Sequence, residues 1–167
     1  MRHIEEHVFF AAHMKYWLFV FFITINVAHA QLTGTVVSVA DGDTFTLLTA
    51  DHEQIRVRLH GIDCPEKKQD FGTKAKDFLA GLVFQKQVTV RETDRDRYGR
   101  TIGIVTVDGV NVNEALLTAG LAWHYTHYDQ NPAWALLEDT ARRAKRGLWS
   151  QGNAIAPWEF RKAKRRK

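Results

Sequence analysis

Gln54-Ile-Arg-Val-Arg-Leu59 alternates apolar and charged side chains, which is the pattern of a β-strand with one buried face. The alternation places both arginines, Arg56 and Arg58, on the face opposite the apolar residues. The stretches Thr35–Val39 and Thr44–Leu48 before it are rich in β-branched residues, and an Asp-Gly pair between them favours a tight turn. These segments predict a three-stranded meander in the first half of the chain.

The rest of the chain adds two strands and three helices. Apolar residues at helical spacing predict the helices, and β-branched runs predict the strands. In chain order the expected elements are a helix over 72–84, strands over 87–90 and 101–107, a helix over 111–119, and a helix from Pro132 that ends before Gly147. This order predicts an α+β fold, a small five-stranded Greek-key β-barrel with three packed helices. Trp149 and Trp158 are expected to pack the C-terminal segment against this body.

The N-terminal segment has the features of a secretory signal. A cation, a short apolar run over residues 16–23 and the small-x-small site Ala28-His-Ala30 predict a signal peptide spanning residues 1–30, which is cleaved after Ala30. Because a signal normally starts close to its cation, we expect translation to begin at Met14. The apolar run is shorter than the roughly 18 residues that a membrane span needs. The mature protein is therefore expected to be exported, periplasmic or extracellular, without a transmembrane domain. The alternatives are an uncleaved anchor and an ordinary apolar helix.

The composition suits one globular domain, and the excess of positive charge is confined to the C-terminal residues. The 167 residues are 45% hydrophobic and 25% charged, and the single cysteine excludes an internal disulfide. The net charge is +4, but residues 161–167 carry six cations and the leader is neutral, so residues 31–160 sum to −2. The body is therefore not a generally basic nucleic-acid binder. The basic C-terminal tail, residues 161–167, is either a disordered, solubilising segment or a binding element for a phosphate backbone.

Five charged residues spread along the chain carry the chemistry. Three are acids that can hold a hard divalent cation and activate a water molecule, and two are arginines that can clamp a phosphate. They are Asp43, Arg58, Asp63, Glu66 and Arg100. Taken one at a time, these residues are equally typical of turns and solvated loops. Together they are the equipment for metal-assisted hydrolysis of a phosphodiester.

The segments that hold these residues resemble the thermonuclease family, the staphylococcal nuclease-like secreted nucleases. The resemblance covers most of residues 33–150, and its motifs occur in the family's order. They are Asp41-Gly-Asp-Thr44, Arg58 followed by Asp63-Cys-Pro-Glu66, Tyr98-Gly-Arg100, Val112-Asn-Glu-Ala-Leu116 and Gly120-Leu-Ala122. Each motif is weak alone, whereas five in order behind a signal peptide are specific. The chain is thus similar to a secreted bacterial member of this family.

The resemblance implies a fold and a metal site. The fold is an OB-fold barrel with three helices, and it makes residues 31–160 the nuclease domain. The carboxylates of Asp43 and Asp63 would ligate Ca²⁺, and the backbone carbonyl of Cys64 would be a further ligand. Asp41 would be an acid close to the metal without ligating it. Ca²⁺ prefers such oxygen ligands and accepts water in its remaining positions.

The resemblance also implies a reaction. Glu66 would order or deprotonate the attacking water, and Arg58 and Arg100 would bind the scissile phosphate and stabilise the transition state. Tyr98 and Tyr128 would contact the nucleotide. The expected activity is hydrolysis of DNA and RNA with little sequence preference, by cleavage of the 5′ P–O bond that leaves 3′-phosphate ends. We expect a monomer without a stable protein partner.

Two rival functions lack catalysis. One is a catalytically silent OB-fold module that only binds single-stranded nucleic acid, and the other is a surface-interaction protein held by its N-terminus. Silent relatives typically lose the catalytic acids or arginines, whereas this chain keeps all five. The nuclease interpretation is therefore preferred.

Overall fold

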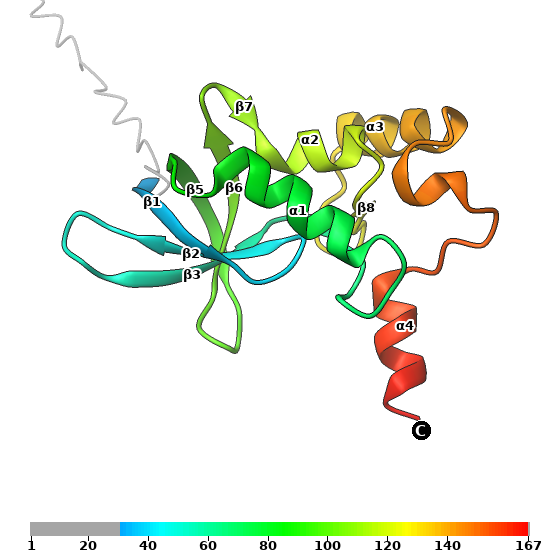
Figure 1. Ribbon diagram of the computed structural model, residues 1–167, viewed down its shortest axis with the longest axis horizontal. Helices are drawn as coiled ribbons and strands as arrows, with labels where there is room; N and C mark the ends of the chain where they lie inside the picture. The colour runs from blue at the N-terminus through cyan, green and yellow to red at the C-terminus, as the bar shows by residue number, and fades with distance from the viewer. Residues whose placement is uncertain (1–30, 167) are drawn as a thin grey trace, which may run out of the picture.

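The computed structural model describes residues 31–166, so the predicted signal peptide lies outside the described residues. A β-barrel occupies one side of the molecule, and the helices lie beside and across it (Figure 1). Its elements in chain order are β1 Gln31–Val39, β2 Thr44–Leu48, β3 Gln54–Leu59, β4 Ile62–Asp63, α1 Gly72–Val83, β5 Gln87–Arg95, β6 Thr101–Val107, β7 Val110–Asn111, α2 Val112–Thr118, β8 Trp123–His124, α3 Pro132–Arg143, the 3₁₀ helix η1 Gly147–Ser150 and α4 Pro157–Lys164. Within residues 31–166, no helix has the length and apolar character needed to cross a bilayer.

The strands close into a barrel because β3 pairs with both β2 and β6. The sheet order is β3-β2-β1-β5-β6-β7, and a parallel pairing of β3 with β6 joins the two ends. Strand alternation sends one face of each strand inward, and those residues form one continuous core. Its fully buried members include Val36, Phe45, Leu47, Val57, Leu59, Val90 and Val105.

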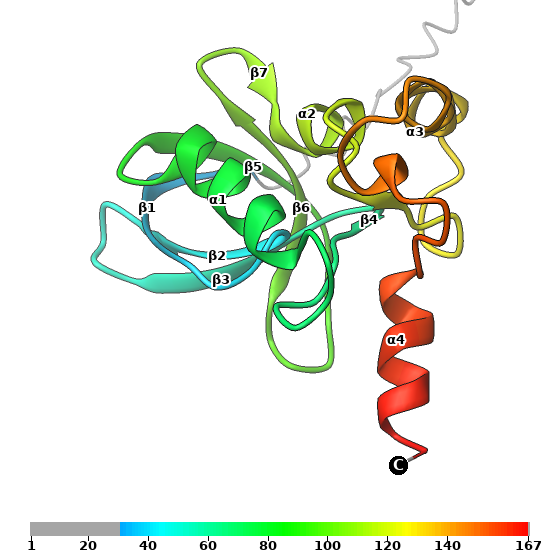
Figure 2. The same ribbon diagram turned by 45° about the vertical axis from the view of Figure 1, so that its right-hand side comes forward.

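Helix α1 lies along the barrel (Figure 2). One apolar face of this helix is buried. Its residues Ala75, Leu79 and Val83 recur at helical spacing and join the barrel core. Helices α2 and α3 begin at asparagine caps, Asn111 and Asn131, whose side chains accept backbone N–H groups of the first turn. These local signals explain why the three predicted helices form where they were expected.

The predicted α+β barrel with its strands and three helices is confirmed, and three features extend it. Strand β5 continues to Arg95 instead of ending at Val90, because its charged half pairs with β6. Two short strands, β4 and β8, pair with each other outside the barrel. A fourth helix, α4, follows the three predicted ones, so the expected boundary of the basic tail at residue 161 falls inside a helix.

Aromatic stacking attaches α4 to the body. The ring of Trp158 stacks on Tyr125 with centroids 4.8 Å apart and an interplanar angle of 8°. Trp158 also meets Trp123 edge to face at 5.6 Å, and Trp149 meets the same Trp123 at 4.5 Å. The expected packing of Trp149 and Trp158 against the body is confirmed. In Figures 1 and 2 the C-terminal end of α4 points away from the rest of the molecule.

Candidate active site

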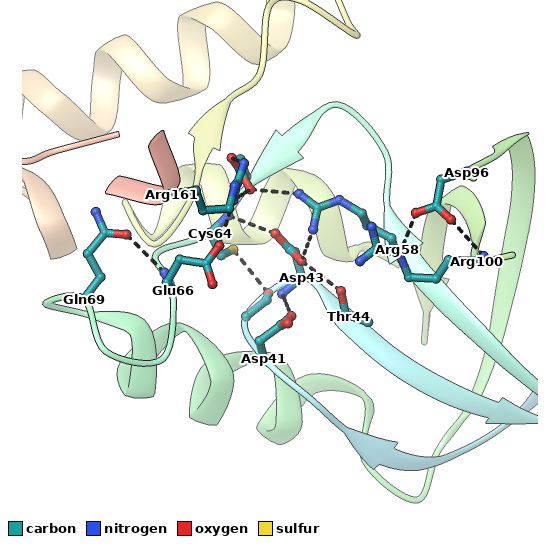
Figure 3. Close-up of polar contacts among 12 residues, drawn as sticks. Asp41, Asp43, Thr44, Arg58, Cys64, Glu66, Gln69, Asp96, Arg100 and Arg161 are labelled. Atoms are coloured by element: carbon teal, nitrogen blue, oxygen red, sulfur yellow. Dashed lines mark hydrogen bonds and ion pairs between the residues drawn. The ribbon is translucent and has the colours of Figure 1, made fainter. Parts of the chain in front are cut away.

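One guanidinium joins two acids at the rim of the barrel. Nη1 of Arg58 lies 2.8 Å from Oδ1 of Asp43, and its Nη2 lies 2.8 Å from Oδ1 of Asp63 (Figure 3). Both carboxylates are buried, and Arg58 is largely so. The residues converge because Thr44 and Arg58 are partners in the β2–β3 ladder, while Asp63 lies in β4 just beyond the end of β3.

Asp43 is held by several hydrogen bonds. Its Oδ2 accepts the backbone N–H of Cys64 at 3.0 Å, and its Oδ1 accepts the hydroxyl of Thr44 at 3.0 Å. Its own backbone N–H donates to Oδ1 of Asp41 at 3.1 Å. The carboxylate of Asp43 is therefore fixed in one orientation. The side chain of Asp41 lies next to the backbone of Asp43, whose N–H it accepts.

Close packing holds the turn that carries these acids. The thiol of Cys64 donates to the carbonyl of Gly42 at 3.2 Å. A Cβ added at Gly42 would lie 2.7 Å from the Cβ atoms of both Ala75 and Cys64. The turn thus fits against α1 and the loop after β4 only because residue 42 has no side chain. Burial raises the pKa of the Cys64 thiol well above its usual value, and nearby Asp43 adds to the rise, so the thiol is neutral.

The site concentrates negative charge in partly desolvated surroundings. Burial, with the charge of Asp43 as the next cause, raises the pKa of Asp41 to about 6. Burial also raises the pKa of Asp63, although hydrogen bonding from Arg161 opposes the rise. Burial by itself would lower the pKa of Arg58, but the charges of Asp43 and Asp63 outweigh it and raise that pKa. Cationic groups therefore stabilise this cluster.

Glu66 lies in the loop after β4, next to the acid pair. Its backbone N–H donates to Oε1 of Gln69 at 3.1 Å, and a Cβ at Gly72 would collide with its carbonyl oxygen. The loop backbone is thus closely fitted to the start of α1. The Glu66 side chain is 40% exposed, so its carboxylate remains accessible to solvent.

Arg100 lies on the flank of the site and does not touch the acid pair. Its Nε lies 2.6 Å from Oδ2 of Asp96, and its backbone N–H donates to Oδ1 of Asp96 at 3.0 Å. Burial alone would raise the pKa of Asp96, but these hydrogen bonds lower it. The parallel β3–β6 pairing sets Arg58 opposite Ile102, two residues after Arg100. Arg100 therefore emerges beside the strand that carries Arg58.

The two tyrosines with an expected role in nucleotide contact are exposed. Tyr98 is 71% exposed, and its ring lies 5.7 Å from the guanidinium carbon of Arg100. Tyr128 is 64% exposed and meets Tyr125 edge to face at 4.9 Å. Exposed rings of this kind are available for stacking on bases.

A third arginine, which the sequence analysis did not identify as a site residue, enters the site from α4. Nη2 of Arg161 lies 2.7 Å from Oδ2 of Asp63, and its Nη1 lies 2.8 Å from Oε1 of Glu66. Nη1 also donates to Oδ1 of Asp63 at 3.2 Å. A signal in the sequence points to this residue: Arg161 follows Trp158 by three positions, so both share a helix face after the helix-starting Pro157.

The donor atoms at this site are oxygens, the type of ligand that a hard divalent cation prefers. Asp43 and Asp63 present carboxylate oxygens to one shared guanidinium, so the two acids face the same small region. Over residues 31–166, no three His, Cys, Asp or Glu side chains form a cluster that could hold a metal unaided. A cation here would therefore use two carboxylates and complete its shell with carbonyl, water or substrate oxygens, as Ca²⁺ readily does.

A closed OB-fold-like barrel with acids and arginines gathered at one rim is suited to binding the phosphodiester backbone of a nucleic acid. The family model described as "Staphylococcal nuclease homologue" matches residues 56–151. The chain belongs to the staphylococcal nuclease family, whose members are metal-dependent hydrolases acting on ester bonds in nucleic acids.

Three bacterial relatives match this chain over most of their length. An uncharacterized endonuclease of Escherichia coli O157:H7 is 43% identical over 148 residues, which cover 88% of this chain and 96% of that protein. A micrococcal nuclease of Shigella flexneri is 41% identical over 148 residues, covering 81% and 84% of the two chains. An uncharacterized endonuclease of Haemophilus influenzae is 37% identical over 145 residues, covering 87% and 82%. In these three pairs the similarity therefore covers most of both chains.

Proposed function

We propose that this chain is a Ca²⁺-dependent endonuclease that hydrolyses DNA and RNA with little sequence preference. The observation that carries the proposal is the bridge that Arg58 makes between Asp43 and Asp63, with Glu66 beside them. A cation-binding acid pair, a partly exposed carboxylate and a guanidinium are thereby brought within one small region. Those are the groups that metal-assisted phosphodiester hydrolysis requires.

The acids have distinct roles in this proposal. Asp43 and Asp63 hold Ca²⁺ through their carboxylates, and the backbone carbonyl of Cys64 is a further ligand. When bound, the cation supplies Lewis-acid polarisation of a phosphoryl oxygen. Asp41 accepts the backbone N–H of Asp43 and adds a negative charge close to it. Its role is to position the ligand and to increase the attraction for a cation.

Glu66 and two arginines carry the chemical step. The half-exposed carboxylate of Glu66 takes a proton from the attacking water, whose oxygen bonds to phosphorus as the bond between phosphorus and the 5′ oxygen breaks. The leaving 5′ oxygen takes a proton from solvent. The products are a 3′-phosphate and a 5′-hydroxyl. Arg58 and Arg100 bind the phosphate oxygens and stabilise the charge that develops on them. Tyr98 and Tyr128 stack on nucleotides of the substrate, and this contact requires no particular base.

A nicking assay tests the proposal. We expect supercoiled plasmid, single-stranded DNA and RNA to be cut in Ca²⁺, to be left intact with a chelator, and to carry 3′-phosphate ends. The Asp43→Asn variant should lose this activity, and the exposed-site variant Asp51→Asn should keep it. Binding of single strands without chelator-sensitive cutting would favour the silent OB-fold module instead.

We propose further that the enzyme is exported and acts as a monomer. The basis is the signal pattern at residues 1–30 and the small-x-small site before Gln31. N-terminal sequencing of the exported protein should begin at Gln31, and light scattering should give the mass of one chain. An N-terminus upstream of Gln31 would indicate an uncleaved anchor.

A further inference from the structure

Helix α4 lies beyond the family-matched region yet reaches the acid pair. The family match ends at residue 151, and α4 begins at Pro157. The helix is attached by the stacking of Trp158 on Tyr125 and by Gln69, whose side-chain amide donates to the carbonyl of Ile155 at 2.6 Å. Gln69 also accepts the backbone N–H of Glu66. The loop that carries Glu66 and the segment leading to α4 are thus tied together.

Arg161 forms ion pairs with both Asp63 and Glu66. Its guanidinium contacts both oxygens of Asp63 and one oxygen of Glu66. Arg58 already occupies Oδ1 of Asp63, so this carboxylate is shared by two guanidinium groups. In this arrangement Asp63 faces two positive charges where a divalent cation would have to bind, and Glu66 is held in an ion pair.

The position of Arg161 allows it to move. Its side chain is 36% exposed, whereas Asp63 is fully buried. Arginine does not lose its proton in proteins, so a divalent cation that arrives at Asp63 repels the guanidinium rather than neutralising it. The strongest alternative partner for a displaced guanidinium is a phosphate, because the planar fork binds two phosphate oxygens at once.

We propose that Arg161 is a third phosphate-binding arginine of the active site, held by Asp63 and Glu66 in the free protein and transferred to a substrate phosphate once a divalent cation binds. This inference rests on the proposed nuclease function.

The test is Arg161→Gln, with Lys162→Gln as the matched control on the same helix. Ca²⁺ binding is measured by titration calorimetry without nucleic acid. Binding of a fluorescent phosphorothioate oligothymidine, which is cut slowly, is measured by anisotropy in saturating Ca²⁺ at several salt concentrations. Circular dichroism melting checks that each variant is folded, and Arg161→Lys provides a second variant that keeps the charge but not the fork.

We expect Arg161→Gln to bind Ca²⁺ about tenfold more tightly, because a positive charge has left the ligand. It should bind the oligonucleotide about tenfold more weakly, with a salt slope shallower by about 0.7, the value for one phosphate contact on a single strand. Lys162→Gln should leave Ca²⁺ affinity unchanged. Arg161→Lys should fall between wild type and Arg161→Gln in oligonucleotide affinity.

Several results would overturn the proposal. Unchanged or weaker Ca²⁺ binding in Arg161→Gln would mean that the guanidinium does not compete with the cation. Tighter Ca²⁺ binding with unchanged oligonucleotide affinity would refute the phosphate contact. If wild type cuts in Ca²⁺ and Arg161→Gln behaves like it in both assays, only the role of Arg161 fails. If wild type neither binds Ca²⁺ nor cuts, the proposed function fails and this inference fails with it.

Discussion

Nη2 of Arg58 lies 2.8 Å from Oδ1 of Asp63, a buried carboxylate only five residues further along the chain. The short separation is possible because the chain turns back after β3 and enters β4. The same guanidinium also holds Asp43, so one arginine links two buried acids, and Arg161 gives Asp63 a second ion pair. Arg58 is therefore a structural group of the free protein as well as a proposed transition-state ligand.

Replacing Arg58 by alanine should destabilise the protein in the absence of metal. The change leaves Asp43 and Asp63 without this guanidinium, and removing one partner of a buried pair costs about 3–5 kcal/mol. Urea denaturation followed by circular dichroism measures the loss. Arg56→Ala, an exposed position on the same strand, should change the free energy of unfolding by about 0.5 kcal/mol or less. Equal effects of the two variants would contradict the assigned pairing.

Glu66→Gln should separate cleavage from binding. Glutamine keeps the size of the side chain but cannot accept a proton from water, so cleavage should slow by about a hundredfold or more. Affinity for the phosphorothioate oligonucleotide should stay close to that of wild type. Glu159→Gln removes the same charge from an exposed position on α4 and should cut at the wild-type rate. A Glu66→Gln variant with wild-type turnover would reject the proton-transfer role.

Arg100→Lys should reduce kcat/KM by about a hundredfold. Asp96 engages Arg100 through Nε, and within residues 31–166 neither Nη group has a protein partner, which leaves the fork for phosphate. Lysine keeps the charge but loses the fork. Steady-state cleavage rates measure the loss, and Arg97→Lys at the neighbouring exposed position is the control. A benign Arg100→Lys would show that charge alone suffices there.

Gly42→Ala should displace the turn that carries Asp43. The added Cβ would approach Ala75 and Cys64 within 2.7 Å, so we expect a loss of about 1–3 kcal/mol in stability and weaker Ca²⁺ binding. The control is Gly81→Ala in α1, where nothing lies within 4 Å, and it should stabilise the helix by about 0.5–1 kcal/mol. Thermal melting and calorimetry give both quantities. A stable Gly42→Ala variant with normal Ca²⁺ affinity would contradict the close fit.

A second charged cluster predicts how stability depends on pH. Asp129 lies 2.8 Å from Nε2 of His124 and 3.3 Å from Nε2 of His60, and it accepts the backbone N–H of Asn131. Burial alone would raise the pKa of Asp129, but these groups, His124 first, lower it below its usual value. The native carboxylate therefore binds a proton less readily than the unfolded one. Its contribution is complete above about pH 4 and is lost as the pH falls through the lower native pKa.

Asp129→Asn tests this dependence. At pH 7 the variant should lose about 1–3 kcal/mol, because the hydrogen-bond acceptor of buried His124 is weakened. The difference from wild type should shrink below about pH 4, as the native Asp129 itself becomes protonated. Urea titrations at several pH values measure it, with exposed Asp51→Asn as the control. A difference that stays constant down to pH 3 would show that the charge of Asp129 is not what stabilises the cluster.

Much of the fold could be predicted because its signals are local. The alternation in Gln54–Leu59 and the helical spacing after Gly72 each depend only on residues a few positions apart in the sequence. Both elements form as expected. The extension of β5 to Arg95 was not predicted, because the charged residues after Val90 do not resemble a strand. Pairing with β6 decides their conformation, and a partner strand is not visible in local sequence.

The sequence by itself determined which acids and arginines the chain carries, and their order identifies a nuclease. It also determined where the barrel strands and the first three helices form. Only the tertiary structure decided which charges meet. Arg161 and Asp63 are 98 residues apart, and they touch because Trp158 packs on Tyr125 and directs α4 toward the acids. Hydrophobic packing is non-directional and acts between distant segments, so the charge pairs that it creates are a property of the folded chain.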